Sequence, residues 1–232
     1  MIATDGWSHF NIWEHSSHVR ELYERRCRRE VEEMTAHRQA AELLAPHVER
    51  GDTLLDAGCG SGYLFHSIAA RMLPVEYYGI DASGTLLDIG RRILPAYGLP
   101  AERLIESRIE DLRADVDHVV CINVLSNIDN YHRPLERLLL AARKTVILRE
   151  SIADFSRYSY VEDRYLDRGV HLKVHVNTYE RQEVKRFIET YGYDVAVHVD
   201  KHSGGQPQNV IDHPHWWTFV EAVRQRPVDL PG

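Results

Sequence analysis

Three glycines at alternating positions, Gly58, Gly60 and Gly62, follow a short apolar run that ends in Asp56. Glycine adopts positive φ angles easily, and it lets a ligand approach the main chain because no Cβ stands in the way. In open α/β sheets, ligands bind at the carboxyl ends of the strands. An apolar strand followed by this turn and a helix therefore indicates a cofactor site.

The spacing of the glycines in the turn indicates which class of cofactor it binds. It reads Gly-x-Gly-x-Gly, whereas dinucleotide-binding folds carry Gly-x-Gly-x-x-Gly. Asp56 stands directly before the turn, where its negative charge would repel a pyrophosphate. The turn therefore favours a cationic or zwitterionic ligand over a dinucleotide.

A second carboxylate, Asp81, ends the next apolar run, residues 75–81. A carboxylate at this place can accept hydrogen bonds from both hydroxyls of a ribose that is bound over the turn. Asp81 and the glycine turn together predict the binding of a nucleoside-containing cofactor.

The elements that position these residues alternate between apolar strands and helices. Such short, β-branched strands are typical of a parallel sheet that helices cover on both faces, an α/β fold. The predicted strands are 53–57, 75–81, 103–106, 117–122, 145–148, 193–199 and 216–223, and the helices between them include 63–72, 134–143 and 179–191, with Ser83 as the N-cap of another.

Two regions outside this alternation are expected to cover the site. Residues 1–50 form a helical cap of two helices with a break near Thr35, the first of them capped by Ser16 or Ser17. Residues 51–232 form the cofactor-binding domain, in which 151–177 is a cap insertion without a clear period. Trp7, Phe10 and Trp13 either close over a ligand or cover core.

Charge and composition exclude several function classes. The formal net charge is −7, which argues against a nucleic-acid-binding surface. No apolar run reaches the ~18 residues of a membrane span, and residues 1–10 lack the features of a signal peptide, so a cytoplasmic protein is expected. The three cysteines are far apart and stand outside zinc spacing, so no metal is expected. The sequence leaves a homodimer open.

The runs LLDAGCGSGYL, GID, SRIEDL and DHVVCINVLSNI resemble the class I S-adenosylmethionine-dependent methyltransferases, and the resemblance covers residues 39–193. It implies a Rossmann-like sheet of seven strands, the last of them antiparallel, with S-adenosylmethionine as cofactor.

The resemblance also implies roles for individual residues. A Cβ at Gly60 is expected to intrude where the methionyl chain runs. Arg38 would either pair with the methionine carboxylate or be a solvated arginine on an amphipathic helix. Departures from the family are Arg108, where many relatives carry Asp, and Asn127, where many carry His. The implied cofactor contacts are Asp56, Gly58 and Gly60 to the methionyl portion, Asp81 to the ribose, Ala82, Ile109 and Glu110 around the adenine, and main chain of Cys121 and Ile122.

Methyl transfer from a sulfonium requires little acid–base chemistry from the protein. The protein aligns the reactants, excludes water, and removes a proton where the acceptor is a hydroxyl. His213 or His215 is the predicted base, with His132 as the competing candidate and Glu150 next. His171 and His175 share one face of an extended segment, as a metal pair or, more simply, a surface pair. The acceptor pocket is predicted to include Asn127, Tyr131, Glu150, Tyr158 and Trp216.

Three other functions compete with this interpretation. A dinucleotide-dependent oxidoreductase requires a third glycine at a spacing that Ser61-Gly62-Tyr63 does not supply. A non-catalytic S-adenosylmethionine-binding protein would have an unlined acceptor site. Enzymes that methylate amino groups of nucleic-acid bases usually carry Asn/Asp-Pro-Pro-Tyr/Phe where this chain reads Asn123-Val124-Leu125-Ser126. The preferred interpretation is O-methylation of a small hydroxylated molecule.

Overall fold

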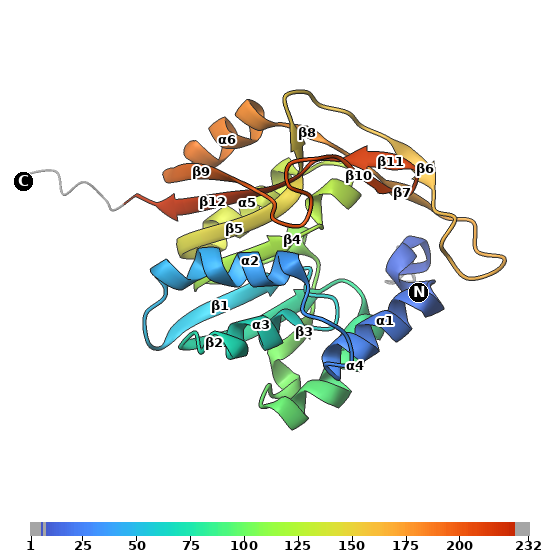
Figure 1. Ribbon diagram of the computed structural model, residues 1–232, viewed down its shortest axis with the longest axis horizontal. Coiled ribbons are helices and arrows are strands. Elements are labelled where there is room, and N and C mark those ends of the chain that lie inside the picture. Colours follow the sequence, from blue (N-terminus) through green and yellow to red (C-terminus); the bar gives the residue numbers. More distant parts are fainter. Residues whose placement is uncertain (1–5, 7, 226–232) are drawn as a thin grey trace, which may run out of the picture.

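The computed structural model describes residue 6 and residues 8–225, and its centre is one twisted sheet (Figure 1). The strand order is β3-β2-β1-β4-β5-β12-β9, and the short β8 pairs with β5 outside this path. Strands β1 to β5 are parallel, whereas β12 is antiparallel to both β5 and β9. The bounds are β1 Asp52–Ala57, β2 Val75–Asp81, β3 Leu104–Glu106, β4 Val116–Ile122, β5 Ala142–Ala153, β8 Tyr179–Glu180, β9 Tyr193–Val199 and β12 Trp217–Arg224.

Helices cover both faces of this sheet, which confirms the predicted α/β class. Helices α2, α3 and α4 pack on one face around Leu44, Leu64 and Leu87, while α5 and α6 pack on the other around Leu135 and Ile188. The α-helices are α1 Ser17–Cys27, α2 Thr35–Leu44, α3 Leu64–Ala70, α4 Gly84–Ile93, α5 His132–Ala141 and α6 Arg181–Glu189; the 3-10 helices are η1 Ser8–Phe10, η2 Ile12–Glu14, η3 Ala45–His47, η4 Leu94–Tyr97, η5 Ala101–Arg103, η6 Ile109–Asp111 and η7 Leu125–Asn127.

The N-terminal region divides between the site and the sheet. Ser16 and Ser83 cap α1 and α4 through their side chains, as an N-cap serine does. Helix α2 contacts β5 and α3, so it belongs to the face of the sheet. Within the N-terminal region, α1 and the 3-10 helices before it reach over the carboxyl ends of the strands, and α2 adds only His37 to the cavity wall. The division of the chain at residue 50 remains a prediction.

Two short hairpins occupy segments in which no regular structure was predicted. The first joins β6 Tyr160–Glu162 to β7 Lys173–His175, and the second joins β10 Gln208–Val210 to β11 His213–His215. Both lie near the N-terminal helices on the right of Figure 1. A small apolar cluster, which we call the lid cluster, joins the three segments: Ile12, Val174 and Val176 are buried in it, and Trp13, Val161, Leu166, Leu172 and Ile211 pack against them.

All three cysteines lie inside the protein. Cys27, Cys59 and Cys121 are free thiols with at most 5% of their surface exposed. Burial raises the pKa of Cys27 to about 11 and those of the other two well above their ordinary value. Among residues 8–225, no helix has the length and apolar character that crossing a membrane requires.

Candidate active site

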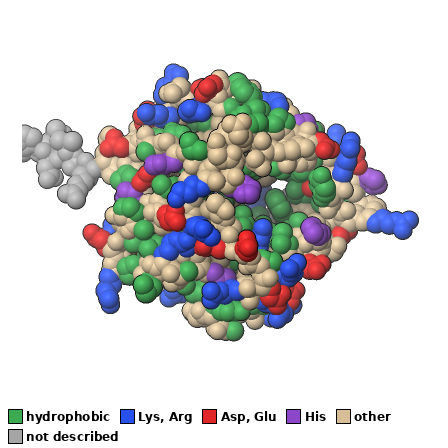
Figure 2. Space-filling model, in the orientation of Figure 1, with side chains coloured by type: hydrophobic (Ala, Val, Ile, Leu, Met, Phe, Trp, Pro, Cys, Tyr) green, Lys and Arg blue, Asp and Glu red, His purple; other side chains and the backbone are tan. Residues whose placement is uncertain are grey.

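A cavity of about 840 Å³ lies at the carboxyl ends of β1, β2 and β4. The glycine turn and the end of β2 form its floor, and the N-terminal helices and the two hairpins cover it. Its mouth is visible as the hollow right of the centre in Figure 2. Ligand cavities typically have about 300–1,000 Å³, so this one has room for a cofactor and a small second molecule.

The glycine turn is held in a shape that only glycine fits. Gly58 and Gly60 have φ angles of +74° and +58°. A Cβ on Gly58 would collide with Val124, and one on Gly60 would collide with the ring of Tyr23 in α1. The nearest protein neighbour of Gly60 is therefore an aromatic side chain, and the expected intrusion on the methionyl chain stays a prediction.

Asp81 presents a partly buried carboxylate to the cavity. One of its oxygens accepts from the main-chain nitrogen of Gly60 at 2.7 Å and the other from that of Ser83 at 2.8 Å. Burial raises the pKa of Asp81 to about 6, against the lowering effect of these two bonds, and Glu14 adds to the rise. No Lys or Arg within residues 8–225 pairs with it, so each oxygen keeps a lone pair for a hydroxyl donor. The site therefore fits a ribose.

Asp56 lies beneath the same end of the cavity. Its carboxyl accepts from the hydroxyl of the buried Tyr77 at 2.5 Å. Burial raises the pKa of Asp56 to about 7, Tyr77 opposes the rise, and the Asp81 carboxylate adds to it. Because negative charge here has no basic partner in the described part of the chain, a ligand ammonium group would complete this site.

Arg26 of α1 supplies a cation that the sequence analysis missed. Its guanidinium donates to the Tyr63 hydroxyl at 2.8 Å, and no acidic side chain of residues 8–225 pairs with it. The Tyr63 ring stacks on His37 at 4.4 Å. The predicted cation, Arg38, pairs instead with Glu33 at 3.1 Å and does not line the cavity. Arg26 stands in a run of arginines, and only the packing of α1 reveals which of them faces the site.

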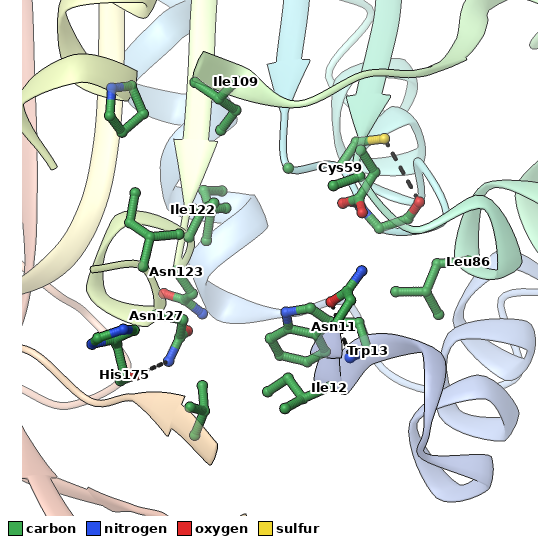
Figure 3. A pocket seen from close by; sticks show the side chains of 18 of the residues that line it. Asn11, Ile12, Trp13, Cys59, Leu86, Ile109, Ile122, Asn123, Asn127 and His175 are labelled. Atoms are coloured by element: carbon green, nitrogen blue, oxygen red, sulfur yellow. Dashed lines mark hydrogen bonds between the residues drawn. The ribbon is translucent and has the colours of Figure 1, made fainter. Parts of the chain in front are cut away.

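The outer half of the cavity is lined by aromatic rings and amides. Asn123 and Asn127 lie on the wall opposite Asn11 and Trp13 (Figure 3). His175 is next to Asn127, whose side-chain nitrogen donates to the His175 carbonyl at 3.0 Å. Of the sequence-predicted site residues, those that line the cavity are Asp56, Gly58, Gly60, Asp81, Ala82, Ile109, Glu110, Ile122 and Asn127; the lining residues that sequence reasoning missed include Arg26, Asn123, Tyr160, Lys173 and Trp217.

The three histidines predicted as bases lie elsewhere. His213 and His215 belong to β11; His215 is 1% exposed, and burial lowers its pKa to about 4. His132 begins α5, where its ring stacks on Tyr131 and its Nδ1 lies 2.8 Å from the Asn130 side-chain oxygen. His175, which was interpreted only as one of a metal or surface pair, is the histidine of the outer half of the cavity.

Of five further predicted residues, three are buried in the fold around the site. Glu150 is buried and accepts from the main-chain nitrogens of Val124, Leu125 and Ser126, so it shapes the turn after β4. Tyr131 and Cys121 are in the core, Tyr158 is exposed, and Trp216 packs edge-on against Phe155. None of these five described residues lines the cavity.

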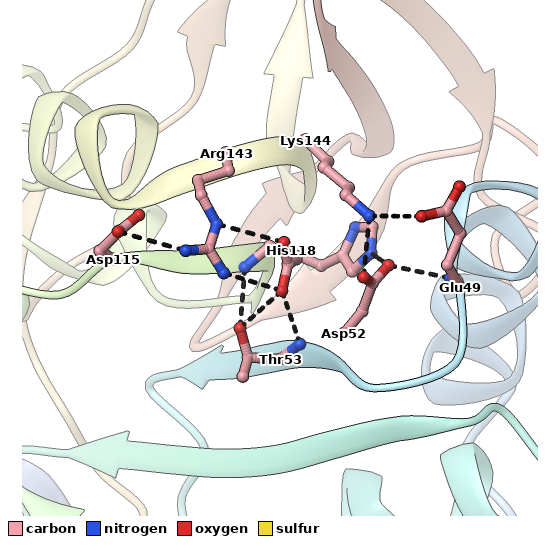
Figure 4. Close-up of polar contacts among 8 residues, drawn as sticks. Glu49, Asp52, Thr53, Asp115, His118, Arg143 and Lys144 are labelled. Carbon is pink, nitrogen blue, oxygen red and sulfur yellow. Dashed lines mark hydrogen bonds and ion pairs between the residues drawn. The ribbon is translucent and has the colours of Figure 1, made fainter.

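A second polar cluster lies at the opposite edge of the sheet, where the strands begin (Figure 4). Asp117 accepts from the nitrogen and hydroxyl of Thr53, both at 2.9 Å, and from Arg143 at 3.0 Å. Burial alone would raise the pKa of Asp117, but the bonds from Arg143 and Thr53 lower it to about 2. Because these groups satisfy one another, this amino-edge network serves the structure and leaves the chemistry to the other edge.

Comparison with known proteins finds similarity to methyltransferases. Residues 55–146 match the family described as "Methyltransferase domain". Among solved structures, magnesium protoporphyrin IX methyltransferase from Synechocystis with bound SAM is 16% identical over 96% of this chain and 92% of that chain, with a TM-score of 0.57.

Two further structures share the fold. An S-adenosylmethionine-dependent methyltransferase from Clostridium acetobutylicum is 14% identical over 88% of this chain and 96% of that one, with a TM-score of 0.60. Phosphoethanolamine N-methyltransferase 2 from Haemonchus contortus is 14% identical over 81% of this chain and 52% of that one, with a TM-score of 0.54. No curated protein sequence matches the chain. Residues 55–146 therefore match a methyltransferase domain, and the chain shares its fold with solved S-adenosylmethionine-dependent methyltransferases.

Proposed function

We propose that the protein transfers the methyl group of S-adenosylmethionine to a hydroxyl oxygen of a small molecule held in the outer half of the cavity. One observation carries the proposal: a single cavity joins the carboxylate of Asp81 at one end to the imidazole of His175, among aromatic rings and amides, at the other. The solved relatives are named for different acceptors, so the acceptor class is argued from this chain's own cavity.

In this proposal the inner half of the cavity holds the cofactor. Asp81 accepts from the ribose hydroxyls, Ile109 and Glu110 flank the adenine, Asp56 faces the ammonium group, and Arg26 pairs with the methionine carboxylate. When bound, S-adenosylmethionine supplies an electrophilic methyl group, so the reactivity resides in the cofactor and not in a protein side chain. The protein's task is to align the acceptor with that methyl group and to exclude water.

His175 is the proposed base for the acceptor hydroxyl. Its ring stacks on Tyr160 at 4.5 Å, and among the described residues neither ring nitrogen has a hydrogen-bond partner. Burial lowers the pKa of His175, against the raising effect of Asp129, so the imidazole is neutral near pH 7 and can accept a proton. This assignment replaces His213, His215 and His132.

Labelled methyl transfer tests the proposal. We would incubate the protein with S-adenosylmethionine carrying a labelled methyl group, a panel of small hydroxylated compounds and their amine analogues, and identify products by mass spectrometry. The methyl group is expected on oxygen. His175→Ala should slow transfer about 10²–10⁴-fold, as loss of a general base does, with cofactor affinity unchanged.

His213→Ala is the matched control, because His213 is a partly buried histidine of the neighbouring hairpin that does not line the cavity. It should leave the rate within about twofold of wild type. Products methylated only on nitrogen, or equal rates for wild type and His175→Ala, would contradict the proposal.

A further inference from the structure

We infer that Arg149 is a positioning residue that fixes the hydrogen-bonding pattern of the outer half of the cavity, and that this pattern selects a flat ring compound with a hydroxyl group beside a carbonyl or carboxylate oxygen. The inference rests on the proposed function only in treating this half of the cavity as the acceptor site. Arg149 belongs to β5 and does not itself line the cavity.

Arg149 is held in a buried ion pair. It is 3% exposed, and its Nε donates at 2.7 Å to Asp200, which is fully buried. The other oxygen of Asp200 accepts from the main-chain nitrogen of Ser203 at 2.8 Å. Burying such a pair often adds little to stability compared with an apolar packing of the same volume. A role in positioning explains why charged groups stand here.

Two cavity-lining side chains depend on this guanidinium. Its Nη1 donates to the side-chain oxygen of Asn123 at 2.5 Å, and its centre lies 4.5 Å from the centre of the Trp217 ring. Asn123 is also held by its main chain, with a φ angle of +59° and a hydrogen bond from its nitrogen to the Arg149 carbonyl at 2.8 Å. Arg149 thus orients both an amide and an aromatic ring of the cavity wall.

The bond to Arg149 decides which end of the Asn123 amide meets a ligand. A guanidinium has only donors, so the atom that faces Arg149 is the amide oxygen, and the NH₂ group is left for the cavity. Asn127 is fixed the other way, because its nitrogen donates to the His175 carbonyl and its oxygen has no partner among residues 8–225. The wall therefore offers one donor beside one acceptor (Figure 3).

The ligand that matches this wall carries the complementary pair of groups. A hydroxyl can donate to the Asn127 oxygen, while a neighbouring carbonyl or carboxylate oxygen accepts from the Asn123 nitrogen. Trp13, Tyr160 and Trp217 line the same half of the cavity, and aromatic faces favour a flat ring. Lys173 also lines this half and adds positive charge, which suits a carboxylate.

Binding of two isomeric probes to the complex with S-adenosylhomocysteine tests the inference. Salicylate has its hydroxyl beside the carboxylate, whereas 4-hydroxybenzoate has the same groups apart. Calorimetry on the wild type should show salicylate binding about tenfold more tightly, since only salicylate satisfies both amides. In Arg149→Met the ratio of the two probes' dissociation constants should fall to about one. The affinity for S-adenosylhomocysteine should stay within about twofold of wild type.

Two further variants keep the test decisive if Arg149→Met folds poorly. Asn123→Asp retains an acceptor for Arg149 but turns a second oxygen toward the cavity, so it should lose the preference in a folded protein. Arg143→Met is the matched control, since Arg143 also pairs with a buried aspartate, Asp117, but at the amino-edge network. It should keep the preference.

Equal binding of the two probes to wild type would overturn the inference, as would an unchanged preference in Arg149→Met or in Asn123→Asp. A parallel loss of S-adenosylhomocysteine affinity in Arg149→Met would show a general structural role instead. Because the readout is probe binding, it is separate from failure of the proposed function, which would appear as absent transfer to oxygen.

Discussion

At the scale of single residues, the site is defined by two carboxylates that lack basic partners in the described part of the chain. Among the described residues, the Asp81 carboxylate accepts hydrogen bonds only from main-chain nitrogens, and the Asp56 carboxyl accepts one only from the Tyr77 hydroxyl. Burial without a compensating cation raises the pKa of both groups. The free protein thus carries unfavourable charge that a ribose and an ammonium group would stabilise.

Cofactor affinity should therefore depend on pH. The pKa of Asp81 is raised to about 6, and its ionised form accepts from the ribose hydroxyls. Protonation at low pH removes that form, so the dissociation constant for S-adenosylhomocysteine should rise about tenfold from pH 7 to pH 5. Isothermal titration calorimetry across this range measures the effect.

Asp81→Asn is the control for this pH dependence. It keeps the size of the side chain and removes its charge, so affinity at pH 7 should fall by about 1.5–3 kcal/mol. In this variant, the loss of affinity between pH 7 and pH 5 should be smaller than in wild type, because only the protonation of Asp56 still contributes to it. A variant with wild-type affinity and wild-type pH dependence would show that Asp81 does not hold the cofactor.

Gly60 should be intolerant of even one methyl group. In Gly60→Ala the Cβ collides with the Tyr23 ring, so the ring or the turn must move. Gly98→Ala is the matched control, because Gly98 also has a positive φ angle, +97°, but no atom within 4 Å of an added Cβ. Urea unfolding should show Gly60→Ala to be less stable than Gly98→Ala by about 1–3 kcal/mol. Equal losses of stability in the two variants would mean that the positive φ angle alone, and not the contact with Tyr23, requires glycine at position 60.

At the scale of elements, the sequence predicted what local pattern determines. The bounds of β2 and β9 match the predicted ranges, since apolar, β-branched runs specify them. Strand β5 runs on to Ala153, beyond its predicted end at 148, because its burial continues through polar residues such as Arg149 and Glu150. Those two are buried by partners distant in sequence, which no local pattern reveals.

The hairpins and the outer half of the site depend on the same kind of distant contact. The turn between β10 and β11 places Ile211 at a φ angle of +50°, a conformation in which a β-branched residue is rare. Ile211 packs in the lid cluster, so long-range contacts override its local preference. The glycine turn and Asp81 were predictable because a strand fixes each locally, whereas His175 and Trp217 reach the cavity only through the hairpins and β12.

The lid cluster should unfold separately from the core. It is small and separate from the two main clusters, and such units open at lower free energy. Val174→Ala should weaken it by about 1–3 kcal/mol and speed amide exchange in the two hairpins, with little change in β1 and β4. Hydrogen-exchange mass spectrometry measures both regions.

Val119→Ala provides the contrast for this experiment. Val119 lies fully buried in β4 within a main cluster, so its loss should speed exchange across the sheet. If Val174→Ala also speeds amide exchange equally in the hairpins and in the sheet, the lid cluster does not unfold separately from the core.

At the scale of the whole molecule, the sheet separates binding at one edge from stability at the other. The amino-edge network lies beneath the starts of β1, β4 and β5, and the cavity lies at the opposite ends of the strands. Changes in the network should therefore alter unfolding without altering cofactor affinity.

Asp117→Ala tests this separation. Loss of its bonds from Thr53 and Arg143 should cost about 1.5–3 kcal/mol of stability, with S-adenosylhomocysteine affinity unchanged. Because the folded pKa is about 2, below the ordinary 3.8, the stabilisation is present above pH 4 and lost as pH falls toward 2. Asp115→Ala removes an exposed partner of the same Arg143 and should change stability little. A loss of affinity in Asp117→Ala would show that the two edges are coupled.

The burial of the three thiols has a practical consequence for spectroscopy. Alkylating dyes attack the thiolate, and the folded protein holds Cys27, Cys59 and Cys121 protonated and out of reach. A cysteine introduced at an exposed position of the first hairpin that does not line the cavity, such as Glu162, would carry the sole reactive sulfur. A fluorophore or spin label can thus be attached to this hairpin while the natural cysteines remain. A second cysteine introduced in α1 would provide the other label, and distances across the mouth of the cavity would become measurable in solution.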